Sequence, residues 1–453
     1  MKFKSFLVLL FVVLSLNIKA QYFLGVGGSS YGGTHLVHYN PALVADSRQI
    51  ADVNIFSLGV FASNNHLSLN AKNGQISENL REEPRYAYFN LDVRGPAALY
   101  SFTAKTPTKQ FSLLTVGFDT RFRTGFSITG MNVNTARLLW NGIAEETLQN
   151  INYLDADFNL GAMAWRETGF TVATTILNTK QHVVNFGAHI KFLTGYDALY
   201  ITSENARYRA LNDDSLFVFD LEFDYGYADD NFQSFDNGDE SIVNSGKGTA
   251  FDIGIVYENR KDIYRMGYRK RMDETQNKYQ YRAGIALLDA GKINYKSPRT
   301  KTFTYSGQSI VTRKEIDSLE GPDDWDALAK SKFAPDSRGS EFSMSLPTHL
   351  NIHFDYKITG PFYLNCNYLA SVGGAKAIAV KQGSFFTATP RYETRKFEAA
   401  IPFSIINQDR ANIGFLIRWR FFTLGSDDFT DVVFNDIDTF NFYFGFRIPI
   451  YRN

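Results

Sequence analysis

The seven histidines are the residues of this chain best suited to metal chemistry. His35 and His38 lie close together, with Asp46 as a possible third ligand. His349 and His353 are four residues apart in a segment that alternates like a strand, where such positions lie about 13 Å apart, too far to share one ion. We expect the histidines to form hydrogen bonds, and we predict no metal and no cofactor.

The acidic clusters and the serines indicate neither a calcium site nor a catalytic site. Acids gather at Asp229-Asp230, at Asp236 to Glu240 and at Asp427-Asp428, and none of these stretches has the ligand spacing of a dedicated calcium loop. We interpret them as solvated loops. Serine and histidine both occur, as in any chain this long, and we predict no catalytic residues and no enzyme.

The first 20 residues have the pattern of an export signal. Two lysines precede an apolar core from Phe6 to Leu16, which is too short to span a bilayer, and Ala20 offers a cleavage point. We predict a signal peptide over residues 1–20. Its removal takes three lysines away and leaves 44 basic residues against 47 acidic ones. This balance argues against a nucleic-acid partner.

Most of the remaining chain consists of segments with a large apolar residue at every second position. In Thr439 to Ile450 the even positions are four Phe and two Ile, whereas the odd positions are mostly polar or small. Leu114 to Phe126, Leu350 to Ile358 and Ala411 to Phe421 repeat the pattern. A period of two places alternate side chains on opposite faces of a β-strand. About fourteen such segments occur, many of them about 9 to 12 residues long.

Strand length separates two architectures that give this pattern. Strands of soluble domains average five or six residues, whereas strands that cross a membrane need about 9 to 11. A membrane barrel turns its apolar faces to lipid and its polar faces to the lumen. The single cysteine, Cys366, allows no internal disulfide. We therefore predict an all-β fold, a transmembrane antiparallel β-barrel of about 14 strands in the bacterial outer membrane, with membrane lipid as its first partner.

Polar residues on the wet faces would then point into the lumen. Arginine binds carboxylates and anionic head groups alike through its planar fork. Three interpretations stay open: pairing with nearby acids that stiffens the wall, contacts that hold an N-terminal segment inside the barrel, or attraction of an anionic head group. We favour pairing. The candidate lumen-facing residues are Asp119, Arg121, Arg123, His353, Asp355, Arg418 and Arg420.

Three short helices are expected. Asn40 is a good N-cap and Pro41 suits the first helical position, but the apolar run that follows ends at Asp46. This helix has one or two turns and needs a surface to pack on. The other two helices are predicted over residues 134–149 and 321–333.

The glycine pair at residues 27–28, followed by Tyr39-Asn40-Pro41-Ala42, resembles the N-terminal signature of the long-chain fatty-acid transporter (FadL-like) superfamily of outer-membrane barrels. In that superfamily the Asn-Pro-Ala segment belongs to a small hatch inside the barrel. The resemblance implies a hatch over residues 21–50 and a barrel over residues 51–453. Its motif residues here are Tyr39, Asn40, Pro41, Ala42 and Asp46.

A closer resemblance spans nearly the whole chain. The sequence is similar to an uncharacterised family, a domain of unknown function, of outer-membrane barrels from Bacteroidota-type bacteria. That resemblance implies a fold and a location but no established activity. It rests on residues 39–48, 91–96, 121–132, 165–173, 189–201, 284–296, 345–357 and 440–450.

Two functions remain open. One is a passive transporter or channel for a small hydrophobic molecule, which predicts a greasy pocket near the hatch. The other is a structural or accessory subunit of an outer-membrane assembly, such as a complex related to type IX secretion, which predicts an occluded lumen and other outer-membrane proteins as partners. The acidic loop over residues 212–240 slightly favours a protein-contact role.

Overall fold

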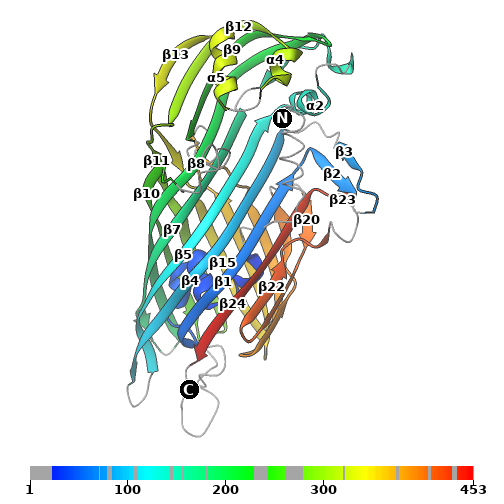
Figure 1. The fold of residues 1–453 in the computed structure, drawn as a ribbon. Coiled ribbons are helices and arrows are strands. Elements are labelled where there is room, and N and C mark those ends of the chain that lie inside the picture. The colour runs from blue at the N-terminus through cyan, green and yellow to red at the C-terminus, as the bar shows by residue number, and fades with distance from the viewer. Residues whose placement is uncertain are drawn as a thin grey trace.

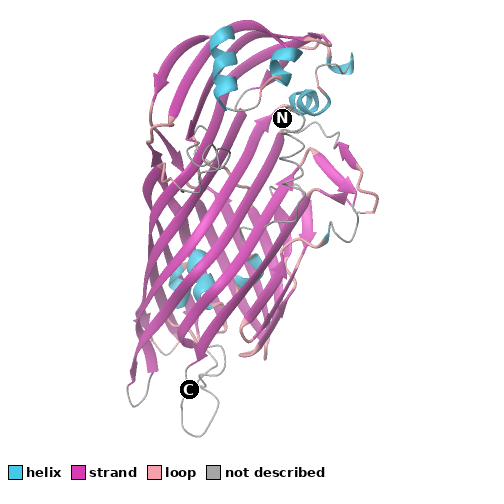
Figure 2. Ribbon diagram, viewed as in Figure 1, coloured by secondary structure: helices cyan, strands magenta, loops and turns pink. Residues whose placement is uncertain are grey.

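Long antiparallel strands form a closed ring in the computed structural model (Figures 1 and 2). The ring has 14 strand positions, and β1 closes it by pairing with β4 on one side and with β24 on the other. Every strand pair in it is antiparallel, so the predicted fold class is confirmed. The structure describes residues 23–70, 72–78, 84–105, 110–142, 146–155, 158–179, 181–228, 243–260, 279–319, 322–373, 377–406, 410–430 and 436–451.

Three positions of the ring are strands interrupted by a short break, at residues 346–348, 401–402 and 414. In ring order the strands are β1 (Gln49–Asn64), β4 (Arg85–Lys105), β5 (Gln110–Met131), β7 (Phe158–Asn178), β8 (His182–Asn212), β10 (Gly246–Asn259), β11 (Tyr281–Tyr295), β14 (Phe342–Ser345) with β15 (His349–Thr359), β16 (Phe362–Ser371), β17 (Phe385–Glu393), β18 (Phe397–Ala400) with β19 (Phe403–Ile406), β20 (Arg410–Ile413) with β21 (Phe415–Trp419), β22 (Phe422–Ser426) and β24 (Thr439–Tyr451).

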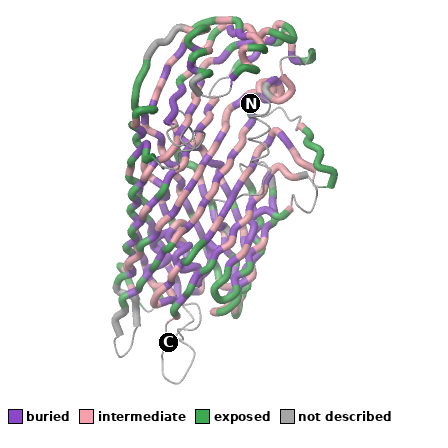
Figure 3. The backbone as a smooth tube through the Cα atoms, viewed as in Figure 1, coloured by how far each residue is buried: buried purple, intermediate pink, exposed green. Residues whose placement is uncertain are grey.

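Burial follows the pattern of a membrane barrel and not that of a soluble sandwich (Figure 3). Along β8, His189 is 0% exposed and Lys191 is 1% exposed, whereas Ile190 and Phe192 between and beyond them are 53% and 54% exposed. The large apolar side chains therefore face outward and the charged ones inward. This inversion identifies the chain as an outer-membrane β-barrel.

The sidedness of the barrel follows from its turns. The links β15–β16, β17–β18 and β21–β22 are only two or three residues long, and they lie at the end where Tyr451 closes the last strand (Figure 1). Outer-membrane barrels have short turns on the periplasmic side and longer loops outside. We assign this end to the periplasm. Among the described residues, no helix is both long enough and apolar enough to cross a bilayer.

At the opposite end the wall extends into a separate layer, which we call the crown. It consists of β9 (Ser215–Ala228), β12 (Lys301–Thr312), α4 (Arg313–Asp317), α5 (Pro322–Lys332) and β13 (Ala334–Gly339). The strand β6 (Tyr153–Asp155), the helix α2 (Val133–Asn141) and the turn η4 (Glu146–Leu148) lie at the same end. A small sheet of β2 (Leu67–Asn70), β3 (Ile76–Glu78) and β23 (Asp436–Ile437) lies beside it.

The N-terminal segment lies inside the ring, in its periplasmic half (Figure 1). We call residues 23–48 the hatch. It contains three turns of 3₁₀ helix, η1 (Leu24–Val26), η2 (Gly33–His38) and η3 (Pro41–Val44). The first barrel strand follows at once, beginning at Gln49.

Three sequence expectations need correction. Asp427 and Asp428, expected in a solvated loop, are 3% and 2% exposed, and Asp427 accepts from the Gly25 amide at 3.1 Å. The helix predicted over residues 134–149 ends at Asn141, because Gly142 adopts a φ of 87° and caps it. Arg420 does not face the lumen, because β21 ends at Trp419 and Arg420 lies exposed in the two-residue turn with a φ of 51°. The helix expected over 321–333 is present as α5. The predicted signal peptide and the acidic stretch 229–240 lie outside the described residues.

Candidate functional site

The Asn-Pro motif begins a single helical turn and also fixes it to the wall. The Asn40 Oδ1 atom accepts a hydrogen bond of 2.9 Å from the Ala42 amide, and Pro41 takes the first position of η3. The Asn40 Nδ2 group donates to the backbone carbonyls of Ile255 on β10 and Ile285 on β11, at 3.4 and 3.3 Å. The barrel wall is thus the surface that this short helix needs.

Two glycines on the wall make room for the motif. A Cβ atom at Gly187 on β8 would lie 2.3 Å from the carbonyl carbon of Pro41, and one at Gly254 on β10 would lie 2.1 Å from Asn40 Oδ1. Neither position tolerates a side chain while the hatch is in place. Gly187 and Gly254 therefore shape the wall to this turn of the hatch.

The remaining motif residues also bind the wall. The Asn351 amide donates to the Tyr39 carbonyl at 2.6 Å, and the Tyr39 ring lies 5.4 Å from that of His353. Asp46 pairs with Arg260 at 2.9 Å. Asp46 therefore does not join the two hatch histidines, and the metal set considered from the sequence is not assembled.

Wall arginines hold the hatch backbone. Arg447 on β24 pairs with Asp52 at 2.9 Å and donates to the Tyr31 carbonyl at 2.9 Å, while Asp52 accepts from the Thr34 amide at 2.7 Å. Arg282 on β11 donates to the Gly28 carbonyl at 2.5 Å. Within the described part of the chain, residues 23–48 pair with no strand. Side chains, and not a β-ladder, hold the hatch.

Above the hatch, four strands contribute a buried charge cluster that links the wall across strands. Arg121 makes a bidentate contact with Asp92 at 2.5 and 2.7 Å. Arg123 pairs with Glu167 at 2.9 Å and with Asp289 at 3.0 Å. Each of the two arginines already has carboxylate partners, which agrees with structural pairing.

The other predicted lumen residues fall into separate places. Asp355 is buried against Arg391, whose Nη2 lies 3.1 Å away, and Arg418 pairs with Glu398 at 2.8 Å. These two pairs form a second cluster on β15, β17, β18 and β21. His353 is buried beside Tyr39, and only Arg420 lies outside the lumen.

A small cavity separates the hatch from the charge cluster. Its volume is about 40 Å³, and its lining includes His35 and His38 of the hatch together with Arg94, Lys191 and Asp289 of the wall. Binding sites for small molecules usually measure about 300 to 1,000 Å³, whereas this volume suits a few water molecules. The greasy pocket expected beside the hatch is absent at this cavity, because polar and charged groups dominate its lining.

The lumen above the cavity is apolar and filled. A loop between β16 and β17 reaches across it, where the Lys381 amide donates to Ser127 Oγ at 2.8 Å and Gln382 donates to Asn90 at 2.9 Å. Val380 of this loop is 0% exposed. It packs in a cluster with Met163, Trp165, Leu193, Ala198, Tyr200, Ala228, Ala250, Ile293, Tyr295, Phe342, Met344 and Leu346.

Residues 28–32 match a Gly-x-Ser-x-Gly pattern, and their surroundings are not those of a nucleophile elbow. Such an elbow joins a strand to a helix, whereas Ser30 precedes a short 3₁₀ turn inside the hatch. The Ser30 hydroxyl lies 3.0 Å from the Tyr279 hydroxyl, and its amide donates to Glu393 at 3.0 Å. Ser30 therefore fastens the hatch.

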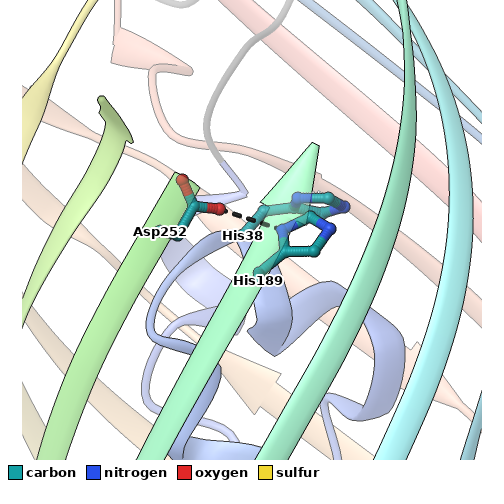
Figure 4. Close-up of side chains that lie close together, drawn as sticks. All are labelled: His38, His189 and Asp252. Carbon is teal, nitrogen blue, oxygen red and sulfur yellow. Dashed lines mark hydrogen bonds and ion pairs between the residues drawn. The ribbon is translucent and has the colours of Figure 1, made fainter. Parts of the chain in front are cut away.

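The inward faces also hold residues that no motif marked. His189 and Lys191 on β8 and Asp252 on β10 join the charge cluster. Figure 4 shows His189 beside Asp252. The alternation of apolar and polar residues could have found them. Residues 184–192 and 251–257 both alternate, and these three positions lie on the polar faces of the two strands.

The closed ring, its outward apolar faces and its internal hatch define a plugged outer-membrane barrel. The chain belongs to the Family of unknown function (DUF5723), whose model matches residues 41–427. No curated protein matches the sequence significantly.

Several solved outer-membrane proteins are similar over most of their length, at low identity. The TodX monoaromatic hydrocarbon channel, as a deltaS2 mutant, is 7% identical with a TM-score of 0.41, over 93% of this chain and 95% of that one. The Ralstonia pickettii toluene transporter TbuX is 10% identical with a TM-score of 0.39, over 93% and 95%. A Pseudomonas aeruginosa FadL homologue is 7% identical with a TM-score of 0.23, over 96% and 100%. Likenesses of this size support no conclusion about a substrate.

Proposed function

We propose that this outer-membrane barrel is a passive channel for a small solute of apolar character and that the hatch is its gate. One observation carries the proposal: among the described residues, side-chain contacts and no β-ladder hold the hatch. Asn40, Arg282 and Arg447 bind it without adding a strand to the wall. Such contacts break and re-form without unpairing any strand of the ring, so the plug can move while the barrel stays intact.

The apolar side chains on the inner surface of the barrel favour an apolar solute. The cluster around Trp165, Tyr295 and Met344 lines the route between the outside and the hatch with apolar side chains. Below it, the cavity of about 40 Å³ is polar and admits only water-sized molecules. Passage therefore requires the hatch to move, and the β16–β17 loop as well.

The proposal is tested by displacing the hatch from the wall side. Gly187→Leu and Gly254→Leu each place a side chain where Pro41 or Asn40 now lies. Gly373→Leu is a matched control, because a Cβ there meets no atom within 4 Å. Single-channel conductance is recorded in planar bilayers for the full chain and each variant, after heat-dependent gel mobility has established folding.

We expect the wild-type chain and Gly373→Leu to remain mostly closed, and both wall variants to conduct at least severalfold more. Uptake of a radiolabelled long-chain fatty acid into proteoliposomes, compared with uptake of a sugar of similar mass, then tests the apolar preference. Folded wall variants that conduct no more than the wild-type chain would overturn the hatch as the gate.

A second function, as a subunit of an outer-membrane assembly, is favoured by the same occlusion. A lumen filled by Trp165, Val380 and the hatch suits a barrel that acts through its outer surfaces. The test is extraction in mild detergent followed by mass analysis of all proteins that co-purify. Stoichiometric outer-membrane partners would support the subunit and count against a free-standing channel, whereas a clean monomer would count against the subunit.

A further inference from the structure

Two histidines and one carboxylate converge where the hatch meets the wall. His38 belongs to η2 of the hatch, His189 to β8 and Asp119 to β5. The His189 Nε2 atom lies 2.9 Å from Asp119 Oδ1, and the His38 Nε2 atom lies 3.7 Å from Asp119 Oδ2. The two imidazole rings lie 5.5 Å apart (Figure 4 shows both). Both histidines therefore direct the same ring nitrogen toward one carboxylate.

The separations of these atoms are compatible with joint coordination of one metal ion. Although His189 Nε2 lies so close to Asp119, neither it nor Asp119 Oδ2 has an aligned hydrogen-bond partner among the described residues, and both atoms are fully buried. Nitrogen and oxygen ligands at about 2.0 to 2.2 Å from a tetrahedral zinc lie about 3.3 Å from each other. The observed separations of 2.9 and 3.7 Å lie on either side of that value.

Asp252 on β10 holds the His189 ring in the orientation that a metal ligand needs. Its Oδ2 atom lies 3.0 Å from His189 Nδ1 (Figure 4). Its Oδ1 atom lies 2.7 Å from Lys191 Nζ. A hydrogen bond from Nδ1–H to a carboxylate leaves the Nε2 lone pair for a metal. Ligand atoms of His38, His189 and Asp252 all lie within 4.8 Å of one another.

Charge balance leaves room for a cation. The five acids of the connected cluster exceed its four bases, three arginines and one lysine, by one, so either a bound cation or a protonated His189 supplies the balancing positive charge. The acids are Asp92, Asp119, Glu167, Asp252 and Asp289, and the bases are Arg94, Arg121, Arg123 and Lys191.

Gly169 on β7 completes the arrangement. A Cβ atom at this position would lie 2.1 Å from His189 Nε2 and 2.7 Å from Asp119 Oδ1. The strand therefore has no side chain where the ring and the carboxylate come together. The adjoining cavity of about 40 Å³ has room for a water molecule as a further ligand.

We propose that His38, His189 and Asp119 bind a divalent transition metal of the zinc class, with Asp252 positioning His189. Two imidazoles and one carboxylate are a donor set that zinc accepts, with water in the fourth position. Because His38 lies in the hatch and the other two ligands lie in the wall, the metal joins the plug to the barrel. The proposal does not depend on channel activity.

The test uses the full chain, purified without a histidine tag and stripped with a chelator. Zinc is added, and bound metal is measured by equilibrium dialysis with elemental analysis. Cobalt replaces zinc in a second titration, which reports the ligand geometry by visible absorption. The variants are His38→Ala, Asp119→Asn and Asp252→Asn. His353→Gln is the matched control, since His353 is also buried in the lumen but lies outside this cluster.

We expect the wild-type chain and His353→Gln to bind about one zinc, and His38→Ala and Asp119→Asn to lose it. Asp252→Asn should weaken binding about 10- to 100-fold, as loss of a partner to a metal-bound histidine usually does. His38 lies outside the strands, so its removal leaves the barrel fold measurable by heat-dependent gel mobility. A wild-type chain without stoichiometric metal, or a His38→Ala variant that binds as the wild type does, would overturn the site; His189 would then be an imidazolium between Asp119 and Asp252.

Discussion

Around the hatch, the inward faces of β5, β7, β8 and β11 carry buried arginines, lysine and acids, whereas in the crown the faces of β9 and β12 beneath α5 carry aromatic rings. Tyr225 lies 5.0 Å from Phe303 and 6.0 Å from Tyr305, measured between ring centroids, in near-parallel stacks. Asp326 of α5 accepts from the hydroxyls of Tyr225 and Tyr305, at 3.0 and 3.1 Å. Ion pairs therefore connect the strands around the hatch. In the crown, stacked aromatic rings connect the strands, and the two tyrosine hydroxyls bond to one carboxylate.

The two regions should respond differently when one side chain is removed. A buried ion-pair cluster adds little net stability, because desolvation offsets attraction, yet removing one member leaves an uncompensated charge. Stacked rings contribute smaller increments that add over many contacts. A substitution in the lumen cluster should therefore destabilise the whole barrel, whereas a substitution in the crown should destabilise only the crown.

The largest effect is expected for Arg123→Met. Arg123 is 1% exposed and pairs with both Glu167 and Asp289, so its loss leaves the buried cluster one positive charge short, although Lys191 and Arg121 remain near the two acids. We expect the free energy of unfolding to fall by about 3 to 5 kcal/mol. Urea unfolding in micelles, followed by tryptophan fluorescence, measures it. The control is Lys296→Ala, which removes an exposed pair with Glu341 and should change nothing measurable; equal losses in the two variants would contradict the comparison.

Asp326→Ala should act within the crown alone. Two buried phenol hydroxyls, those of Tyr225 and Tyr305, lose their acceptor, at a cost of about 1 to 3 kcal/mol. Amide hydrogen exchange should accelerate in α5 and β12 and remain unchanged in β5 and β8. Faster exchange throughout the barrel would show that the crown and lumen are a single cooperative unit.

Asn40→Ala should loosen the hatch. The change removes the cap on η3 and two contacts with the wall, and a lost cap alone costs about 1 kcal/mol. Exchange of the amides of residues 33–46 should quicken while the strands keep their protection. Asn73→Ala, in an exposed turn far from the hatch, is the matched variant and should leave the hatch amides as they are.

The smallest effect is expected for the pH dependence of the stability of α4 in the crown. Hydrogen bonds from Lys332 and the Thr312 amide lower the pKa of Glu315 from 4.5 to about 2. Because the folded pKa is depressed, the stabilisation of α4 is complete above pH 4.5 and is lost as the pH falls toward 2. Limited pepsin digestion between pH 4.5 and 2 should cut the crown progressively faster. In Glu315→Gln the rate should lack this pH-dependent component, and an unchanged profile would exclude Glu315 as its source.

The sequence reasoning reached the barrel because a period of two depends only on neighbouring residues. The alternation in residues 184–192 placed His189 and Lys191 on one face before any partner was known. It could not pair them, because Lys191 meets Asp252 and Asp289 through the register of β8, β10 and β11. Arg123 and Asp289 are 166 residues apart in sequence.

The residues at which strands and helices end could not be predicted from the alternation either. Arg420 continues the alternation of Ala411 to Phe421 and still lies outside, because the chain turns at that residue. Likewise, Gly142 ends a helix whose apolar spacing runs on past it. The position of the hatch in the barrel came from a resemblance, and the wall arginines that hold it, such as Arg447, carry no motif of their own.

The hatch continues directly into β1 at Gln49, on the periplasmic side of the ring. Even with every side-chain contact broken, this covalent tether would keep the segment beside its own opening. Short tethers hold a group at an effective concentration of about the millimolar range, which makes rebinding an intramolecular event. If the hatch leaves the lumen as proposed above, a plug attached in this way would return by thermal motion alone.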